Sequence, residues 1–278
     1  MSAIDYEAEY DNRGRVPEHP EIFARWARDA AAFRAAHPHA ELGLAYGKSP
    51  CETIDLFWPA VDRDAPIALF IHGGYWRALD PTQFGHLAAG ANANGVALAL
   101  PGYNLCPAVS IEQIVDEMRN AAAFLYRRHK RRLMASGHSA GGHLTACLLA
   151  TDWKKLAADL PADLVPTGLS ISGLFDLAPL MQNSMNKDLK INPGNVARIS
   201  PLGWDVSAGR TFDAWVGGAE SSEFLRQSRE IAEAWGRKGV ATRCVEAPGA
   251  NHFTVIDPLA DPKSAITARL VELTEALA

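Results

Sequence analysis

A serine stands at the centre of a G-x-S-x-G pentapeptide, Gly137 to Gly141, with Ser139 as the middle residue. The pentapeptide follows an apolar run, Leu133 to Ser136, and leads into a helix-forming run that begins at Ala140. This strand, turn and helix order is the context of a nucleophile elbow, where glycines avoid the clash that a Cβ would cause. The pattern therefore predicts a nucleophilic serine that attacks an acyl carbon.

A second glycine-rich turn precedes the serine in the chain. The apolar run Ile67 to Ile71 ends in His72-Gly73-Gly74. Glycines after a strand let backbone N–H groups point into a cleft, where they stabilise a developing oxyanion. We expect an oxyanion hole formed by the N–H of Gly73 or Gly74 together with that of Ala140.

A serine nucleophile needs a general base, and His252 has the expected place in the chain. It follows the apolar run Thr242 to Val245 and precedes only one more helical stretch, as the order serine, acid, histidine requires. His138 adjoins Ser139, but we expect it to point to the other side of the turn. A lone histidine in this late loop makes His252 the predicted base.

The acid that orients this histidine should follow a late strand. Glu220 comes after the apolar run Phe212 to Val216 and is the preferred candidate. The competing carboxylates are Glu223, Asp213 and, less well placed, Asp176 and Asp257. Glu220 has its own alternative role as a helix cap, so the choice of acid stays open here.

The elements that must position these residues alternate between strand-like and helix-like runs after residue 50, which predicts a mostly parallel sheet covered by helices. The expected strands are Ile54 to Trp58, Ile67 to Ile71, Val96 to Leu100, Leu133 to Ser136, Leu169 to Ser172, Phe212 to Val216 and Thr242 to Val245. The expected helices are Gln83 to Ala93, Ile111 to His129, Ala140 to Ala150, Ser222 to Lys238 and Lys263 to Leu277. The whole chain, 1–278, is expected to form one domain.

Two further segments are candidate covers for the active site. Residues 1–50 are expected to form a helical extension, in which Pro20 to Ala36 carries an apolar stripe that must dock on the sheet or on a second subunit. Residues 177–204 form a long irregular insertion that suits a cap. A homodimer is compatible with the apolar stripe.

Composition excludes several classes of function. The chain has 278 residues, 48% hydrophobic residues and a net charge of −5, so neither nucleic acid nor an anionic membrane surface is an expected partner. The basic run Arg127 to Arg132 is interpreted as a helix end.

The start of the chain does not resemble a signal peptide, and no apolar run is long enough to span a membrane. We expect a soluble, cytoplasmic protein that binds a small-molecule substrate.

Neither a metal nor another cofactor is expected from the sequence. The histidines lack a zinc-ligand spacing, and the proposed chemistry needs no metal. The cysteines are scattered and are interpreted as reduced packing residues: Cys51, Cys106, Cys147 and Cys244.

Several segments together resemble the kynurenine formamidases (arylformamidases), in the hormone-sensitive-lipase-like branch of the α/β hydrolases. These are H-G-G-Y-W from His72, G-H-S-A-G-G-H-L from Gly137, Ala214 to Phe224, Asn251 to Phe253, Tyr10 to Arg13 and Pro101 to Pro107. The resemblance covers nearly the whole chain. It implies a Ser139, Glu220 and His252 triad with kynurenine and formate as products. Many members of the wider fold have aspartate where Glu220 stands.

Aromatic residues next to the predicted catalytic loops are candidates to contact an aromatic leaving group: Tyr75, Trp76, Tyr103 and Phe253. Asn104 and Asn251 are candidate polar partners for an amino-acid substrate. The alternatives are a carboxylesterase acting on small esters, which shares the elbow and the oxyanion hole, and a catalytically silent hydrolase scaffold. The complete order of serine, acid and histidine argues against the silent scaffold.

Overall fold

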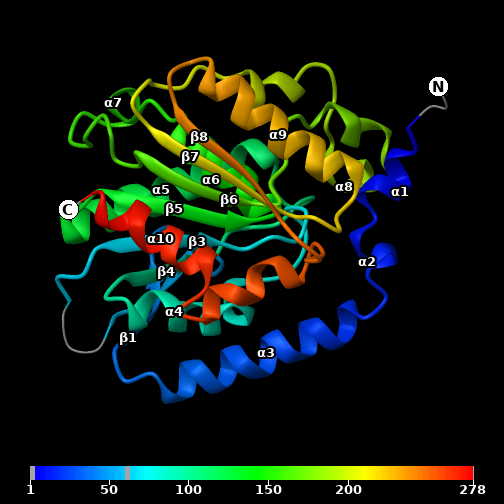
Figure 1. Cartoon of the computed structure of the whole chain (residues 1–278). Coiled ribbons are helices and arrows are strands. Elements are labelled where there is room, and N and C mark those ends of the chain that lie inside the picture. Colours follow the sequence, from blue (N-terminus) through cyan, green and yellow to red (C-terminus); the bar gives the residue numbers. More distant parts are fainter. Residues whose placement is uncertain (1–3, 60–62, 278) are drawn as a thin grey trace.

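An eight-stranded sheet forms the centre of the molecule (Figure 1). The computed structural model describes residues 4–59 and 63–277, so both ends of the expected 1–278 domain lie outside the described residues. The strand order is β1-β2-β4-β3-β5-β6-β7-β8. β1 and β2 pair antiparallel with their neighbours, and β3 to β8 are parallel. The predicted α/β class with a mostly parallel sheet is confirmed.

The strands are close to the predicted apolar runs, with one addition at the sheet edge. Their bounds are β1 Ala40–Ala45, β2 Thr53–Phe57, β3 Ile67–Ile71, β4 Ala97–Pro101, β5 Leu133–His138, β6 Thr167–Ile171, β7 Thr211–Gly217 and β8 Ala241–Ala247. β1 was not expected, because none of its residues is buried and it lacks the apolar run of a buried strand. Residues 1–50 are therefore not a purely helical extension.

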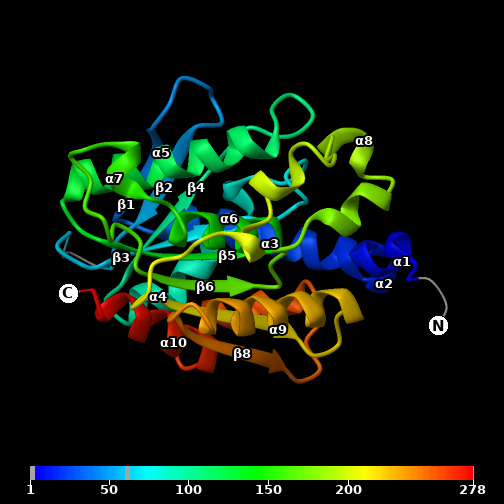
Figure 2. The same ribbon diagram turned by 90° about the horizontal axis from the view of Figure 1, so that it is seen from above.

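Helices cover both faces of the sheet (Figures 1 and 2). They are α1 Tyr6–Tyr10, α2 Asn12–Arg15, α3 His19–Ala36, α4 Ala88–Ala93, α5 Ile111–His129, α6 Ala140–Leu149, α7 Trp153–Leu156, α8 Asn186–Leu189, α9 Ser222–Gly236 and α10 Ala265–Glu275. Short 3₁₀ turns are η1 Pro81–Gln83, η2 Gly85–Leu87, η3 Ala178–Gln182, η4 Val196–Arg198, η5 Pro201–Gly203 and η6 Thr254–Ala260. The helix expected over 83–93 is thus two 3₁₀ turns followed by α4.

Each face of the sheet has its own apolar core. Residues of α5, α6 and α9 pack on one face. Residues of α3, α4 and α10 pack on the other face. The near-continuous burial of β3, β4, β5 and β6 follows from this double cover, since a parallel strand between two helical layers has no solvent-facing side.

The apolar stripe of α3 docks on its own chain. Trp26 is buried, and its Nε1 donates a hydrogen bond to Asp257 Oδ1 at 2.8 Å. Arg25 forms an ion pair with the same carboxylate at 2.6 Å, and Phe23 meets Phe253 edge-on with ring centroids 5.0 Å apart. The stripe therefore brings the N-terminal helix to the loop that follows β8.

No helix in the described part of the chain is long and apolar enough to cross a membrane. All four cysteines are free thiols, but Cys51 and Cys244 are exposed, so they are not packing residues as expected.

The turn between β5 and α6 packs tightly against β3. A Cβ added at Gly141 would overlap the carbonyl oxygen of Ile71, and one added at Gly137 would overlap the Gly141 carbonyl. Backbone atoms on both sides of the turn leave no room for relief. This close approach holds the start of α6 against the carboxyl end of β3.

Gly141→Ala is expected to destabilise the protein by about 2 kcal/mol or more, because overpacking against backbone cannot be relieved by a rotamer change. Gly203→Ala is the matched control, since a Cβ there meets nothing within 4 Å and the cost should stay within about 0.5 kcal/mol. Urea unfolding of both variants measures the difference. Equal stability of the two variants would contradict the packing argument.

Candidate active site

Ser139 occupies the turn between β5 and α6 in a strained backbone conformation. Its φ is 57° and its ψ is −116°, a region that non-glycine residues rarely adopt. Its N–H donates to the carbonyl of Ile171 at the end of β6, at 2.8 Å. The following residue, Ala140, begins α6, where the first N–H groups have no acceptor within the helix. The turn thus places a hydroxyl beside free backbone donors at the positive end of a helix dipole.

A buried carboxylate and imidazole lie in the loops after β7 and β8. His252 Nδ1 is 2.6 Å from Glu220 Oε2, and the two side chains are 5% and 0% exposed. A carboxylate can only accept a hydrogen bond, so Nδ1 carries a proton, and the tautomer that this contact selects has its lone pair on Nε2. A neutral imidazole held in this tautomer can act as a general base.

The second oxygen of Glu220 is also bonded. Oε1 accepts hydrogen bonds from the Gly217 N–H at 2.7 Å and from Ser172 Oγ at 2.6 Å. Ser172 follows β6 and has a positive φ of 51°. Nothing in the sequence pattern singled out Ser172, because its partner is 48 residues away in the chain. These bonds compensate the desolvation of the buried carboxylate.

The competing acids are engaged elsewhere. Asp213 forms a two-bond ion pair with Arg269, at 2.6 and 3.1 Å. Glu223 accepts from Arg226 at 2.7 Å and from the Tyr10 hydroxyl at 2.9 Å. Asp257 binds α3, and Asp176 accepts from the Ala178 N–H at 3.0 Å. Within the described residues, Glu220 is the carboxylate that contacts the His252 ring.

The glycines of the first turn lie against the serine. A Cβ on Gly73 would stand 3.0 Å from Ser139 Cβ and 2.8 Å from the His138 carbonyl oxygen. Gly74 has a φ of +108° and lines the same cavity as Ser139. Of the predicted oxyanion-hole residues, Gly73 and Ala140 thus adjoin Ser139, and Gly74 lines the same cavity.

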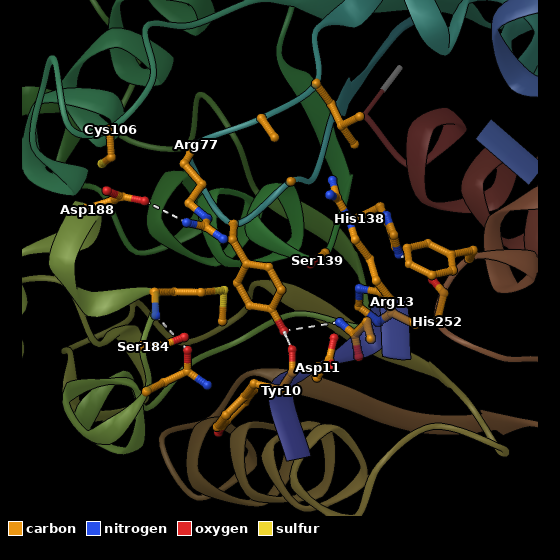
Figure 3. Close-up of a pocket in the computed structure, with 18 of the residues that line it drawn as sticks. Tyr10, Asp11, Arg13, Arg77, Cys106, His138, Ser139, Ser184, Asp188 and His252 are labelled. Carbon is orange, nitrogen blue, oxygen red and sulfur yellow. Dashed lines mark hydrogen bonds and ion pairs between the residues drawn. The ribbon is translucent and has the colours of Figure 1, made fainter. Parts of the chain in front are cut away.

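A cavity of about 570 Å³ opens over Ser139 (Figure 3). Its residues come from the N-terminal segment, the loop after β3, the two catalytic loops and the 177–204 insertion. The residues that line the cavity include Tyr10, Asp11, Asn12, Arg13, Phe23, Trp26, Gly74, Tyr75, Arg77, Cys106, His138, Ser139, Asn183, Ser184, Asp188, His252 and Phe253. Both predicted cover segments thus contribute to its wall. In the described residues, no group of three His, Cys, Asp or Glu side chains is arranged to hold a metal.

A family model for the alpha/beta hydrolase fold matches residues 68–256 of the chain, which include the glycine-rich turns, Ser139, Glu220 and His252. The chain belongs to the α/β-hydrolase family.

Known relatives narrow the resemblance. The kynurenine formamidase of Danio rerio is 27% identical over 84% of this chain and 81% of its own, and that of Drosophila melanogaster is 28% identical over 78% and 76%. A crystal structure from Silicibacter sp. TM1040, of a protein provisionally described as a thioesterase, superposes with a TM-score of 0.87 at 33% identity. The superposition covers 98% of this chain and 100% of the Silicibacter chain. This member of the α/β-hydrolase family is a hydrolase, and its relatives include two formamidases and a protein provisionally described as a thioesterase.

Two of the predicted aromatic contacts are wrong. Trp76 is fully buried and donates from Nε1 to His143 Nδ1 at 3.2 Å, outside the cavity wall. Tyr103 stacks on the His72 ring with centroids 4.2 Å apart and donates to the His72 carbonyl. Tyr103 thus packs against the glycine turn, whereas Trp76 packs against α6. Tyr75 and Phe253 do line the cavity.

Two predicted polar contacts and one orientation also need correction. Asn104 bonds to Glu117 at 2.9 Å and does not line the cavity, and Asn251 accepts from the N–H groups of its own turn. His138 does not point away from the site. It lines the cavity, and its Nε2 is 2.7 Å from the His252 carbonyl oxygen, so it donates there and joins the elbow to the His252 loop.

Three buried histidines surround the elbow in neutral form. Burial lowers the pKa of His72 and of His143 to about 4. Burial, with the nearby His252 as a smaller contribution, holds the pKa of His138 well below its ordinary value. All three side chains are buried, so protonation of any of them would place a poorly solvated charge inside the protein.

The free energy of unfolding of this α/β hydrolase is therefore expected to decrease as the pH falls below about 6.5. In that window the unfolded chain takes up protons that the native His72, His138 and His143 do not, so the native state loses stability. Three such groups together predict a loss of roughly 3 kcal/mol between pH 6.5 and 5.5. Urea unfolding at several pH values measures it. His143→Gln should remove about one third of the slope, and an unchanged slope would contradict the assignment.

Proposed function

We propose that the protein hydrolyses N-formyl-L-kynurenine to L-kynurenine and formate, with Ser139, His252 and Glu220 as its catalytic residues. The observation that carries the proposal is the 2.6 Å contact between His252 Nδ1 and the buried Glu220 carboxylate, with His252 on the wall of a cavity that Ser139 also lines. The named activity of the fish and fly relatives supports the substrate.

In the first half of the reaction, His252 Nε2 removes the proton of Ser139 Oγ as the oxygen attacks the formyl carbon. The oxyanion that forms accepts hydrogen bonds from the N–H of Gly73 or Gly74 and from that of Ala140. Glu220 stabilises the imidazolium of His252 through Nδ1. The imidazolium then protonates the aniline nitrogen, and the C–N bond breaks to release the amine.

In the second half, His252 removes a proton from a water molecule that attacks the formyl ester of Ser139. The same backbone donors stabilise the second oxyanion. Collapse returns the proton from His252 to Ser139 Oγ and releases formate. Each residue thus returns to its initial state.

The composition of the cavity wall supports an aromatic leaving group. Phe23, Trp26, Tyr75 and Phe253 line the cavity over Ser139 and offer apolar surface to an aryl ring. Phe253 is 6% exposed and is fixed by Phe23 and Trp26, so this part of the wall is preformed. An aniline is a better leaving group than an alkylamine, and a serine triad suited to esters can expel it. A small-ester carboxylesterase would use the same residues with a different leaving group.

The kcat/KM of wild-type protein on N-formyl-L-kynurenine is expected to exceed that on p-nitrophenyl acetate. Ser139→Ala should lower both by about 10⁴-fold or more, because the nucleophile is lost while binding remains. Steady-state kinetics on purified proteins makes the comparison. Ester turnover without formamidase turnover would refute the formamidase proposal and favour the carboxylesterase.

Glu220→Gln is expected to lower kcat by about 10³ to 10⁴-fold, since an amide no longer stabilises the imidazolium. Steady-state kinetics measures the loss.

Ser172→Ala removes one of the bonds that hold Glu220 and should lower kcat about tenfold with little change in KM. Ser170→Ala is the control, because the buried Ser170 hydroxyl has no hydrogen-bond partner among the described residues. Equal kcat values for the Ser172 and Ser170 variants would contradict the positioning role of Ser172.

A further inference from the structure

The first residues of the chain form one wall of the catalytic cavity. We call residues 5–16 the N-terminal strap; it contains α1 and α2. Glu7, Tyr10, Asp11, Asn12 and Arg13 all line the cavity that holds Ser139. The strap comes from a part of the chain that precedes the sheet, and Figure 3 shows its residues around the same space as His252.

Hydrogen bonds from the strap to Tyr75 and Glu223 hold it in place. The buried Tyr10 hydroxyl donates to Glu223 Oε2 at 2.9 Å, and the Tyr10 carbonyl accepts from the Tyr75 hydroxyl at 2.8 Å. Asn12 Nδ2 donates to the same Tyr75 hydroxyl at 3.1 Å. Asp11 lies between Tyr10 and Asn12, and Arg13 follows Asn12 directly. The bonds of Tyr10 and Asn12 therefore fix the backbone that carries the two charged residues, Asp11 and Arg13.

Arg13 is a cation without a carboxylate partner. Among the residues that the structure describes, no carboxylate oxygen lies within 4.0 Å of its guanidinium, which rests over the Phe23 ring at 5.8 Å from the centroid. The other arginine of the cavity wall, Arg77, is already paired with Asp188 at 2.6 Å. Arg13 therefore has donors available for a ligand, whereas Arg77 is neutralised by the protein.

Asp11 is the complementary anion. Its Oδ1 accepts from the Gly14 N–H at 2.9 Å, which leaves the second oxygen of the carboxylate for a ligand. Glu7 is less available, because both of its oxygens accept hydrogen bonds from Ser184, one of them at 2.8 Å from the Ser184 N–H. Arg13 and Asp11 thus form a pair of opposite, incompletely satisfied charges on one wall.

We propose that Arg13 and Asp11 bind the amino-acid end of the substrate: the guanidinium of Arg13 takes the α-carboxylate, and the Asp11 carboxylate takes the α-ammonium. This inference rests on the proposed function. A guanidinium presents paired N–H groups that match the two oxygens of a carboxylate. Asp11 and Arg13 are exposed residues of the cavity wall, whereas Trp26 and Phe253 on the same wall are buried. The proposal therefore places the zwitterion at the exposed strap residues and the aryl ring against the buried aromatic residues.

The same arrangement selects a class of substrate. An aryl formamide or ester without charges gains nothing from Arg13 and Asp11, so the pair should discriminate in favour of α-amino acids. The interaction is made equally in the ground state and the transition state, because it is remote from the reacting carbon. Its loss should therefore raise KM more than it lowers kcat.

The test compares Arg13→Gln with Arg28→Gln, which removes the same charge from an exposed position on α3 outside the cavity wall. On N-formyl-L-kynurenine, Arg13→Gln should lower kcat/KM by roughly tenfold or more through KM, whereas Arg28→Gln should change it less than about twofold. On uncharged formanilide both variants should match wild type. An equal loss on both substrates for Arg13→Gln, or no loss on either, would overturn the proposal.

Inhibition by the product separates this inference from the proposed activity. L-Kynurenine should inhibit p-nitrophenyl acetate hydrolysis competitively, with an inhibition constant raised about tenfold or more by Arg13→Gln and unchanged by Arg28→Gln. This result would support the site even in a protein that failed to hydrolyse N-formyl-L-kynurenine, where only the proposed activity would fall. Inhibition that is absent, or insensitive to Arg13→Gln, would refute the site.

Asp11→Asn tests the second contact and keeps the side-chain oxygen that caps α2. It should weaken inhibition by L-kynurenine but not by 3-(2-aminobenzoyl)propanoic acid, which has the carboxylate and lacks the ammonium. Equal weakening for both inhibitors would show that Asp11 acts on the fold of the strap and not on the ammonium.

Discussion

The strained turn at Ser139 is the constraint on which the rest of the site depends. A serine with φ of 57° between β5 and α6 is stable only where its neighbours fix the backbone on both sides. The Ser139 N–H bonds to the end of β6, while the backbone at Gly141 lies against the carbonyl at the end of β3. The two neighbouring strands therefore determine where the hydroxyl stands and which backbone donors surround it.

A buried electrostatic network completes the site on the other side of the serine. Glu220 is desolvated, but its oxygens accept from Ser172, Gly217 and His252, so the charge is compensated where it stands. Neutral His138 then ties the elbow to the carbonyl of His252. The result is a site built from the loops after five different strands, in which Glu220 contacts residues of the loops after β6 and β8 and His138 contacts the loop after β8.

Much of the wall of the cavity over Ser139 comes from segments outside the sheet. The N-terminal strap, α3 and the 183–188 part of the insertion close the cavity around the catalytic residues. Trp26 and Arg25 bind Asp257, and Tyr10 binds Glu223, so these covers are joined to the loops that carry the chemistry. In this α/β hydrolase, the sheet positions Ser139, Glu220 and His252, and the added segments form the wall of the cavity over the serine.

The sequence by itself determined the fold class, the elbow at Ser139 and the order in which Glu220 and His252 follow it, because these are local or sequential patterns. A strand with buried apolar residues, a G-x-S-x-G turn and a helix can be recognised from neighbours in the chain. The structure alone decided what depends on distant neighbours: Ser172 on Glu220, Trp76 and Tyr103 in the core, His138 turned toward His252, and Arg13 in the cavity. The exposed β1 edge also escaped recognition, since edge strands lack the apolar run of a buried strand. The partners in these contacts are far apart in the chain: Ser172 and Glu220 are separated by 48 residues, and His138 and His252 by 114. A local sequence pattern cannot encode a contact between residues so far apart.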